Sequence, residues 1–137
     1  MFANRFTALT DACSLAGALK RNILLTLAEA EFFRLRWSAQ ILDETQTAIE
    51  KILSGKGAED APERARRARD AMERVFEEAC VGVDGKLDTL AGLPDPNDKH
   101  VMAAALKAQA AVIVTDNLKD FPEAETVDIL KPHMMSL

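Results

Sequence analysis

The chain has 137 residues, a length typical of one domain, and 48% of them are hydrophobic, which is enough to form a core without cross-links. Its net charge of −5 argues against bulk nucleic-acid binding through long-range attraction, but it is compatible with an enzyme that gathers acids around a metal. Cys13 and Cys80 lack the spacing of a zinc site, and we expect both to be small core residues. Because we find neither a secretory signal nor an apolar run of about 20 residues, we expect a cytoplasmic protein without a membrane segment.

The first half of the chain predicts one strand followed by three helices. The apolar run from Phe6 to Thr10 predicts the strand, and large apolar residues recur at helical spacing from Leu15 to Ala30. Ser38 is a suitable N-cap for a second helix, which the Ser54–Gly57 segment ends. A third helix is expected to begin near Pro62, because proline is favoured in a first helical turn.

The second half of the chain predicts one more helix and the remaining strands. The stretch from Gly82 to Gly92 is compatible with one short strand or with none. Asp95 and Pro96 fit the N-cap and first position of a helix that continues to Gln109. Ala111–Val114 is apolar throughout, as is typical of a strand in a parallel sheet, and a last short strand is expected at Thr126 to Leu130.

This order of elements predicts a single α/β domain over residues 1–137, in which a central parallel sheet lies between helices in three α/β/α layers. In such a sheet, ligands bind beyond the carboxyl ends of the strands. Asp11 directly follows the first strand, and Thr115, Asp116 and Asn117 directly follow the Ala111–Val114 strand. We therefore expect both segments at the same edge of the sheet.

Two further acids are expected to reach this edge from helices. Asp98 falls at the third position of its helix and shares a face with Val101 and Met102, so its carboxylate should lean inward from the positive end of the helix dipole. Glu44 lies beside the apolar stripe of the second helix, whereas Asp43 points about 100° away and should be solvated. Each acid, taken alone, also fits an ordinary cap, turn or solvated position.

Several carboxylates that lie close together repel one another, so they take up protons or bind a cation. Oxygen ligands suit Mg²⁺ or Mn²⁺, which can activate water and neutralise charge on a phosphodiester. Spacing alone leaves this metal site as one hypothesis among several. The two histidines add nothing to it, since we expect His100 on a helix surface and His133 in the tail.

Four segments resemble the PIN domain family, which includes the VapC-type toxin ribonucleases of toxin–antitoxin pairs. The segments are Asp11-Ala12-Cys13, Trp37 to Glu44, Leu93 to Ala105 and Val114 to Pro122, and the last two are fairly specific in this order. The resemblance implies a Mg²⁺- or Mn²⁺-dependent endoribonuclease. It also implies a homodimer and an antitoxin that covers the acidic pocket.

The family's acidic quartet falls on Asp11, Glu44, Asp98 and either Asn117 or Asp116, and the first three would hold the metal. Thr115 resembles the hydroxyl residue that the family carries near its site.

Competing functions remain open at this point. A dehalogenase-type phosphatase needs Asp-x-Asp after its first strand, and Cys13 occupies the third position here. A PIN-fold scaffold that has lost its chemistry is the serious alternative. The third helix carries five arginines that are interleaved with acids, which favours an ion-paired face over an RNA-binding one; they are Arg64, Arg66, Arg67, Arg69 and Arg74.

Overall fold

The computed structural model of the chain describes residues 6–82, 96–115 and 133–135. Its elements are β1 (Thr7–Thr10), α1 (Ala12–Ala16), α2 (Ala18–Glu29), β2 (Arg34–Ser38), α3 (Ala39–Gly55), α4 (Ala61–Val75), β3 (Cys80–Val81), α5 (Pro96–Ala108), β4 (Val112–Val114) and β5 (His133–Met135). None of the described helices is long and apolar enough to cross a membrane.

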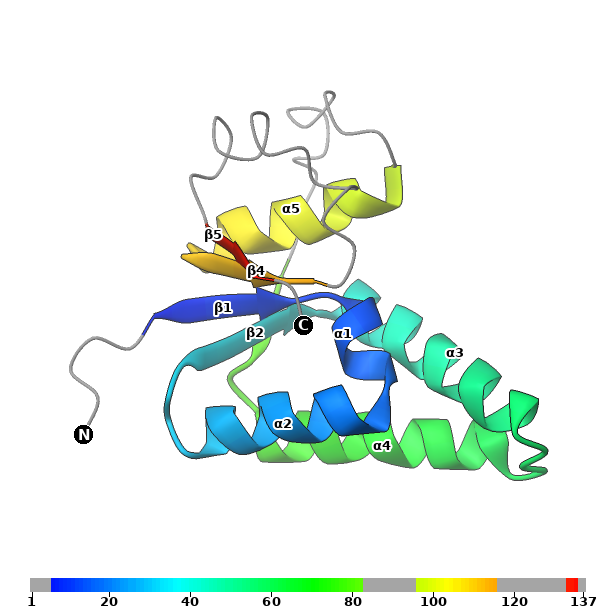
Figure 1. Cartoon of the computed structure of the whole chain (residues 1–137). Helices are drawn as coiled ribbons and strands as arrows, with labels where there is room; N and C mark the ends of the chain where they lie inside the picture. Colours follow the sequence, from blue (N-terminus) through cyan, green and yellow to red (C-terminus); the bar gives the residue numbers. More distant parts are fainter. Residues whose placement is uncertain (1–5, 83–95, 116–132, 136–137) are drawn as a thin grey trace.

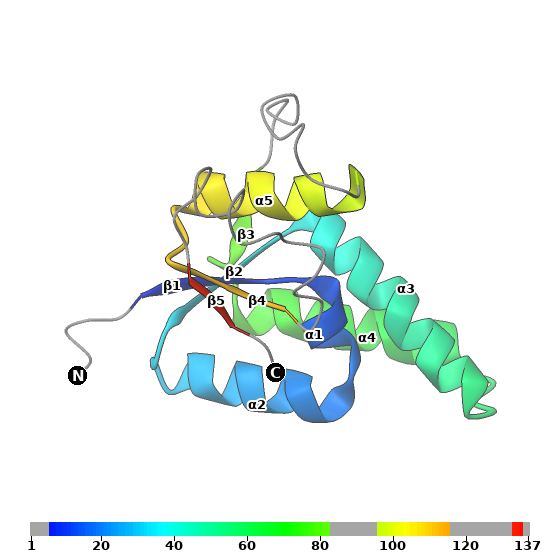
Figure 2. The same cartoon turned by 45° about the horizontal axis from the view of Figure 1, so that its top comes forward.

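The five strands form one parallel sheet in the order β3-β2-β1-β4-β5. The first strand of the chain is therefore the central one, with Ala8 opposite both Leu35 of β2 and Val112 of β4. Helix α5 covers one face of the sheet, and α2 and α4 cover the other (Figures 1 and 2). The predicted three-layer α/β/α architecture with a central parallel sheet is confirmed.

The core lies where the apolar strands meet the helices on both faces. Leu9, Trp37 and Ile113, from three neighbouring strands, are fully buried, as expected for parallel strands that are covered on both sides. The Trp37 indole packs edge-on against the Phe76 ring, with ring centroids 6.0 Å apart. Each large side chain buried in this way contributes about 1.5–3 kcal/mol.

The segment from Leu15 to Ala30 forms two helices instead of the single one predicted. The chain is extended at Gly17, with φ −77° and ψ 132°, and this interrupts the helix. Arg21 of α2 then donates from Nη1 to the carbonyl oxygens of Leu15 and Ala16, at 2.9 and 3.0 Å. These bonds satisfy carbonyls that the end of α1 would otherwise leave free, and partial burial lowers the pKa of Arg21.

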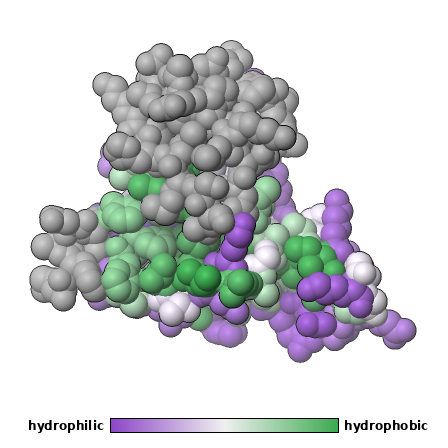
Figure 3. All heavy atoms as spheres, in the orientation of Figure 1, coloured by the Kyte–Doolittle hydropathy of each residue, from purple (hydrophilic) through white to green (hydrophobic). Residues whose placement is uncertain are grey.

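Helix α2 places part of its apolar stripe on the surface. Leu19, Ile23 and Leu27, spaced four residues apart, are exposed, whereas Leu24 is buried in the core. Figure 3 shows the resulting hydrophobic surface over α2, in the orientation of Figure 1.

The later helices begin as predicted. Ser38 is the N-cap of α3, and its hydroxyl accepts from the backbone N–H of Ile41 at 3.1 Å. Pro62 lies in the first turn of α4.

Several predicted details are wrong. The strand β2 was not predicted, and the doubtful short strand β3 lies at Cys80–Val81, just before the stretch considered for it. Cys13 and Cys80 are exposed rather than buried, because they lie on outward faces of α1 and of an edge strand. His133 belongs to β5 and not to a tail. The strand expected at Thr126 to Leu130 lies outside the described residues.

Candidate active site

Asp11 lies at the carboxyl end of the central strand, where two different segments hold its side chain. One oxygen, Oδ1, caps α1 by accepting from the backbone N–H of Ser14 at 3.0 Å. The other, Oδ2, accepts from the Thr115 hydroxyl at 2.6 Å. Asp11 is only 6% exposed, so the two bonds fix a largely buried carboxylate in one orientation.

The contact between Thr115 and Asp11 follows from the pairing of their strands. Thr10 is opposite Val114 in the parallel ladder of β1 and β4, and the Asp11 N–H donates to the Val114 carbonyl at 3.3 Å. Both strands therefore end at the same edge of the sheet, as the sequence predicted. Thr115 and Ser14 are fully buried here, so the donors that orient Asp11 belong to the packed interior.

Glu44 and His100 form a second polar pair, which joins α3 to α5. The Nε2 atom of His100 lies 3.0 Å from each carboxylate oxygen of Glu44. The histidine side chain is 5% exposed and the glutamate side chain 37% exposed. The Nδ1 atom of His100 is buried and has no hydrogen-bond partner among the residues that are described.

The prediction that His100 lies on a helix surface is therefore wrong. Residues three and four positions further along a helix share a face, and here they are Ala103 and Ala104, both buried. This spacing placed His100 on the inner face of α5, and it was the signal that could have identified the residue.

The remaining predicted site residues are only partly described. Asp98 is the third residue of α5, in its first turn and two residues before His100, but its side chain lies outside the described part. Asp116 and Asn117 follow Thr115 and lie outside it altogether. Within the described residues, no three His, Cys, Asp or Glu side chains come together as a possible metal site.

The described donors nevertheless fit a hard divalent cation. Asp11 and Glu44 offer carboxylate oxygens, the ligands that Mg²⁺ and Mn²⁺ prefer. Helix α1 follows β1, and α3 follows β2. Both helices begin at the carboxyl edge of the sheet, and so does α5 (Figure 1). Residues near the starts of these helices therefore lie in one region of the molecule.

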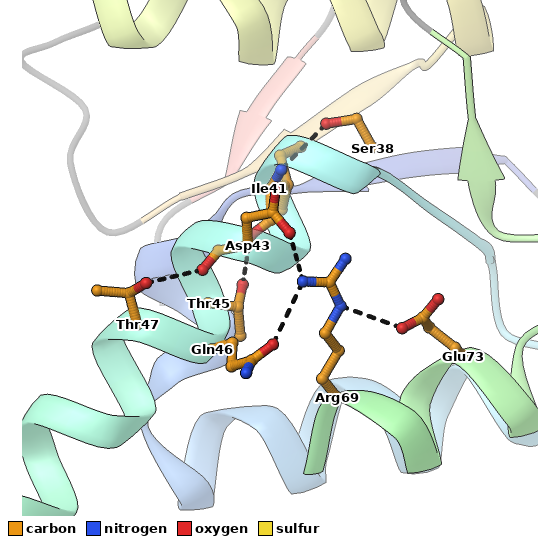
Figure 4. Close-up of polar contacts among 8 residues, drawn as sticks. All are labelled: Ser38, Ile41, Asp43, Thr45, Gln46, Thr47, Arg69 and Glu73. Carbon is orange, nitrogen blue, oxygen red and sulfur yellow. Dashed lines mark hydrogen bonds and ion pairs between the residues drawn. The ribbon is translucent and has the colours of Figure 1, made fainter. Parts of the chain in front are cut away.

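A polar network on the outside of α3 and α4 supports the helix that carries Glu44 (Figure 4). Arg69 of α4 forms an ion pair with Asp43 of α3, donates to Gln46 at 3.3 Å, and contacts Glu73 at 3.0 Å. Burial by itself lowers the pKa of Arg69, but the hydrogen bonds and charges of Asp43 and Glu73 outweigh it and raise the pKa.

Two of the five arginines on α4 form the predicted ion pairs. Arg69 pairs with Asp43 and Glu73. The Nη1 atom of Arg64 lies 3.8 Å from Oδ1 of Asp60. Asp43 is largely exposed, as expected, although it is paired with Arg69.

Comparison with known proteins identifies the family to which this chain belongs. The sequence model of the PIN domain family matches residues 8–119, which covers most of the chain from β1 to beyond Thr115. The chain belongs to the PIN domain family.

One relative matches over a shorter stretch. A segment of 38 residues is 53% identical to "Putative ribonuclease VapC50" of Mycobacterium tuberculosis (strain ATCC 25618 / H37Rv). The match covers 28% of this chain and spans 20% of the length of that relative. No solved structure was found to match the chain significantly.

Proposed function

We propose that this protein is a Mg²⁺- or Mn²⁺-dependent endoribonuclease, the toxin of a toxin–antitoxin pair. Membership of the PIN domain family and the partial similarity to a protein named as a ribonuclease support this proposal. The observation that carries it is the Asp11 carboxylate, which is buried at the end of the central strand and held by Ser14 and Thr115. An aspartate that only capped a five-residue helix would not need a second, buried donor from another strand.

In this proposal, Asp11, Glu44 and Asp98 hold the metal, and Asn117 or Asp116 completes the site. When bound, the metal supplies a Lewis acid that activates water and neutralises charge on the phosphodiester. The chain's own part is to orient the ligands. Thr115 and Ser14 each occupy one oxygen of Asp11 with a donor, and each oxygen keeps a lone pair for a cation.

The wider setting is proposed on the same basis. The substrate would be RNA, and the partners would be an antitoxin and a second copy of this chain, in the cytoplasm. The exposed Leu19, Ile23 and Leu27 of α2 supply a hydrophobic surface of the kind that partners cover. Residues 1–137 would form one nuclease domain.

The test is cleavage of labelled RNA by the purified protein in Mn²⁺, in Mg²⁺ and in EDTA. We expect metal-dependent cleavage that falls at least about 100-fold in the Asp11→Asn/Asp98→Asn variant, because loss of metal-ion catalysis costs several kcal/mol. Asp70→Asn, an exposed aspartate on α4, is the matched control and should cleave at the wild-type rate.

Three other results would change the conclusion. Equal cleavage by the wild-type protein and the double variant would identify a contaminating nuclease. Absence of cleavage together with stabilisation by Mn²⁺ would indicate that the RNA tested is not the substrate. Absence of both would support the alternative, a PIN-fold scaffold or partner-binding subunit without catalysis.

A further inference from the structure

The His100–Glu44 pair is a partly buried polar contact, and the proposed ligands alone do not explain it. The histidine comes from α5 and the glutamate from α3, so the pair joins two helices through residues that are 56 positions apart in sequence. Both carboxylate oxygens lie at the same distance from Nε2, which places the ring nitrogen on the midline of the carboxylate.

The contact restricts the Glu44 side chain more than it restricts His100. Glu44 is more than one-third exposed, so packing does not fix its side chain, and holding it in one conformation costs side-chain entropy. His100 is almost completely buried and is therefore already fixed by its surroundings. A rigid donor that faces a mobile acceptor determines where the acceptor lies.

The direction of the hydrogen bond follows from the chemistry of the two groups. An ionised carboxylate only accepts, so the hydrogen lies on Nε2. In the neutral ring, Nδ1 then carries a lone pair, which agrees with the lack of an acceptor for it among the described residues.

We propose that His100 is a positioning residue, whose Nε2–H holds the Glu44 carboxylate in place for a divalent cation at the carboxyl edge of the sheet. This inference rests on the proposed metal-dependent function. His100 acts through Glu44 and does not itself touch the metal or the RNA. Helix α5 then contributes twice: Asp98 in its first turn as a ligand, and His100 two residues later as the group that orients a ligand on α3. Replacing a residue that orients a metal ligand in this way commonly costs about 10–100-fold in metal affinity or activity.

The test measures Mn²⁺ affinity calorimetrically on the full chain, without RNA. His100→Gln keeps an N–H donor near the position of Nε2 and should bind Mn²⁺ within about 3-fold of the wild-type protein. His100→Leu removes the donor and should bind roughly 10–100-fold more weakly. If His100→Leu does not fold, His100→Met makes the same comparison with an unbranched side chain.

A double variant separates positioning from packing. Because His100 acts only through Glu44, Glu44→Gln/His100→Leu should bind Mn²⁺ no more weakly than Glu44→Gln alone. In cleavage assays, His100→Leu should lower kcat and leave the KM for RNA unchanged, since the imidazole does not contact RNA.

The outcomes distinguish this inference from the proposed function. If the wild-type protein binds Mn²⁺ and His100→Leu binds it equally well, the positioning role is wrong and the proposed function stands. If His100→Gln loses as much affinity as His100→Leu, or if the losses of Glu44→Gln and His100→Leu add, His100 acts as packing or as a ligand, and the inference is also wrong. If the wild-type protein does not bind Mn²⁺, both proposals fall together.

Discussion

The hydrogen bond from Thr115 to Asp11 makes a measurable prediction for Thr115→Val, which keeps the β-branched shape and removes the hydroxyl. The bond is 2.6 Å long, and both residues are buried. A hydrogen bond to a charged group contributes about 1.5–3 kcal/mol. Burying a methyl group in place of the hydroxyl returns about 0.8 kcal/mol. The expected net loss in the free energy of unfolding is therefore about 1–2 kcal/mol.

The assay is urea unfolding in EDTA, so that metal binding does not contribute to stability. With a slope of about 2 kcal/mol per molar urea, this loss lowers the midpoint by roughly 0.5–1 M. The same substitution in the Asp11→Asn background should cost less than about 0.7 kcal/mol, because a neutral hydrogen bond is about half as strong as a charge-assisted one and the methyl group still returns its share. An equal cost in both backgrounds would mean that the Thr115 hydroxyl does not stabilise the Asp11 carboxylate and does not orient it.

Two further predictions concern stability away from this bond. In urea unfolding, Leu24→Ala should cost about 2–4 kcal/mol and Ile23→Ala less than about 0.5 kcal/mol, because Leu24 is 4% exposed and Ile23 is 48% exposed. Similar losses for the two variants would contradict the orientation of α2. Arg69→Met should cost about 0.5–1 kcal/mol in low salt and less in 1 M NaCl, since its carboxylate partners are mostly exposed and salt screens them. A loss that did not depend on salt would show that packing of the Arg69 stem, rather than its charge, joins α3 to α4.

The sequence predicted most of the fold because the elements that define it have strong local signals. Ser38 caps its helix with its own hydroxyl, and Pro62 lies in the first turn of the next one, so both boundaries depend on residues near in sequence. The strand β2 was missed because it is only five residues long, although Leu35 and Trp37 alternate with Arg34 and Arg36 as in a half-buried strand. Its assignment as a strand depends on pairing with β1 and β3, which lie far away in the chain.

The sequence predicted those positions in the candidate site that follow from the order of the strands. It did not predict the contacts that depend on how helices pack against each other. The position of Asp11 at the edge shared with β4 follows from two parallel strands. The pairing of Glu44 with His100 depends on how α5 rotates against α3, and no local pattern contains that information. The helical spacing of His100 with Ala103 and Ala104 predicts burial of the histidine, but not its partner.

The position of β1 at the centre of the sheet has a consequence for the order of events during synthesis. Asp11 and Thr115 are 104 positions apart, so at a translation rate of about 5–20 residues per second, roughly 5–20 s separate their addition to the chain. Until β4 has been made, β1 lacks one of its two neighbours and Asp11 lacks the hydroxyl that holds it. A nascent chain on the ribosome therefore cannot assemble the candidate site until more than four-fifths of the sequence has been translated, so the proposed activity is delayed until synthesis is almost complete.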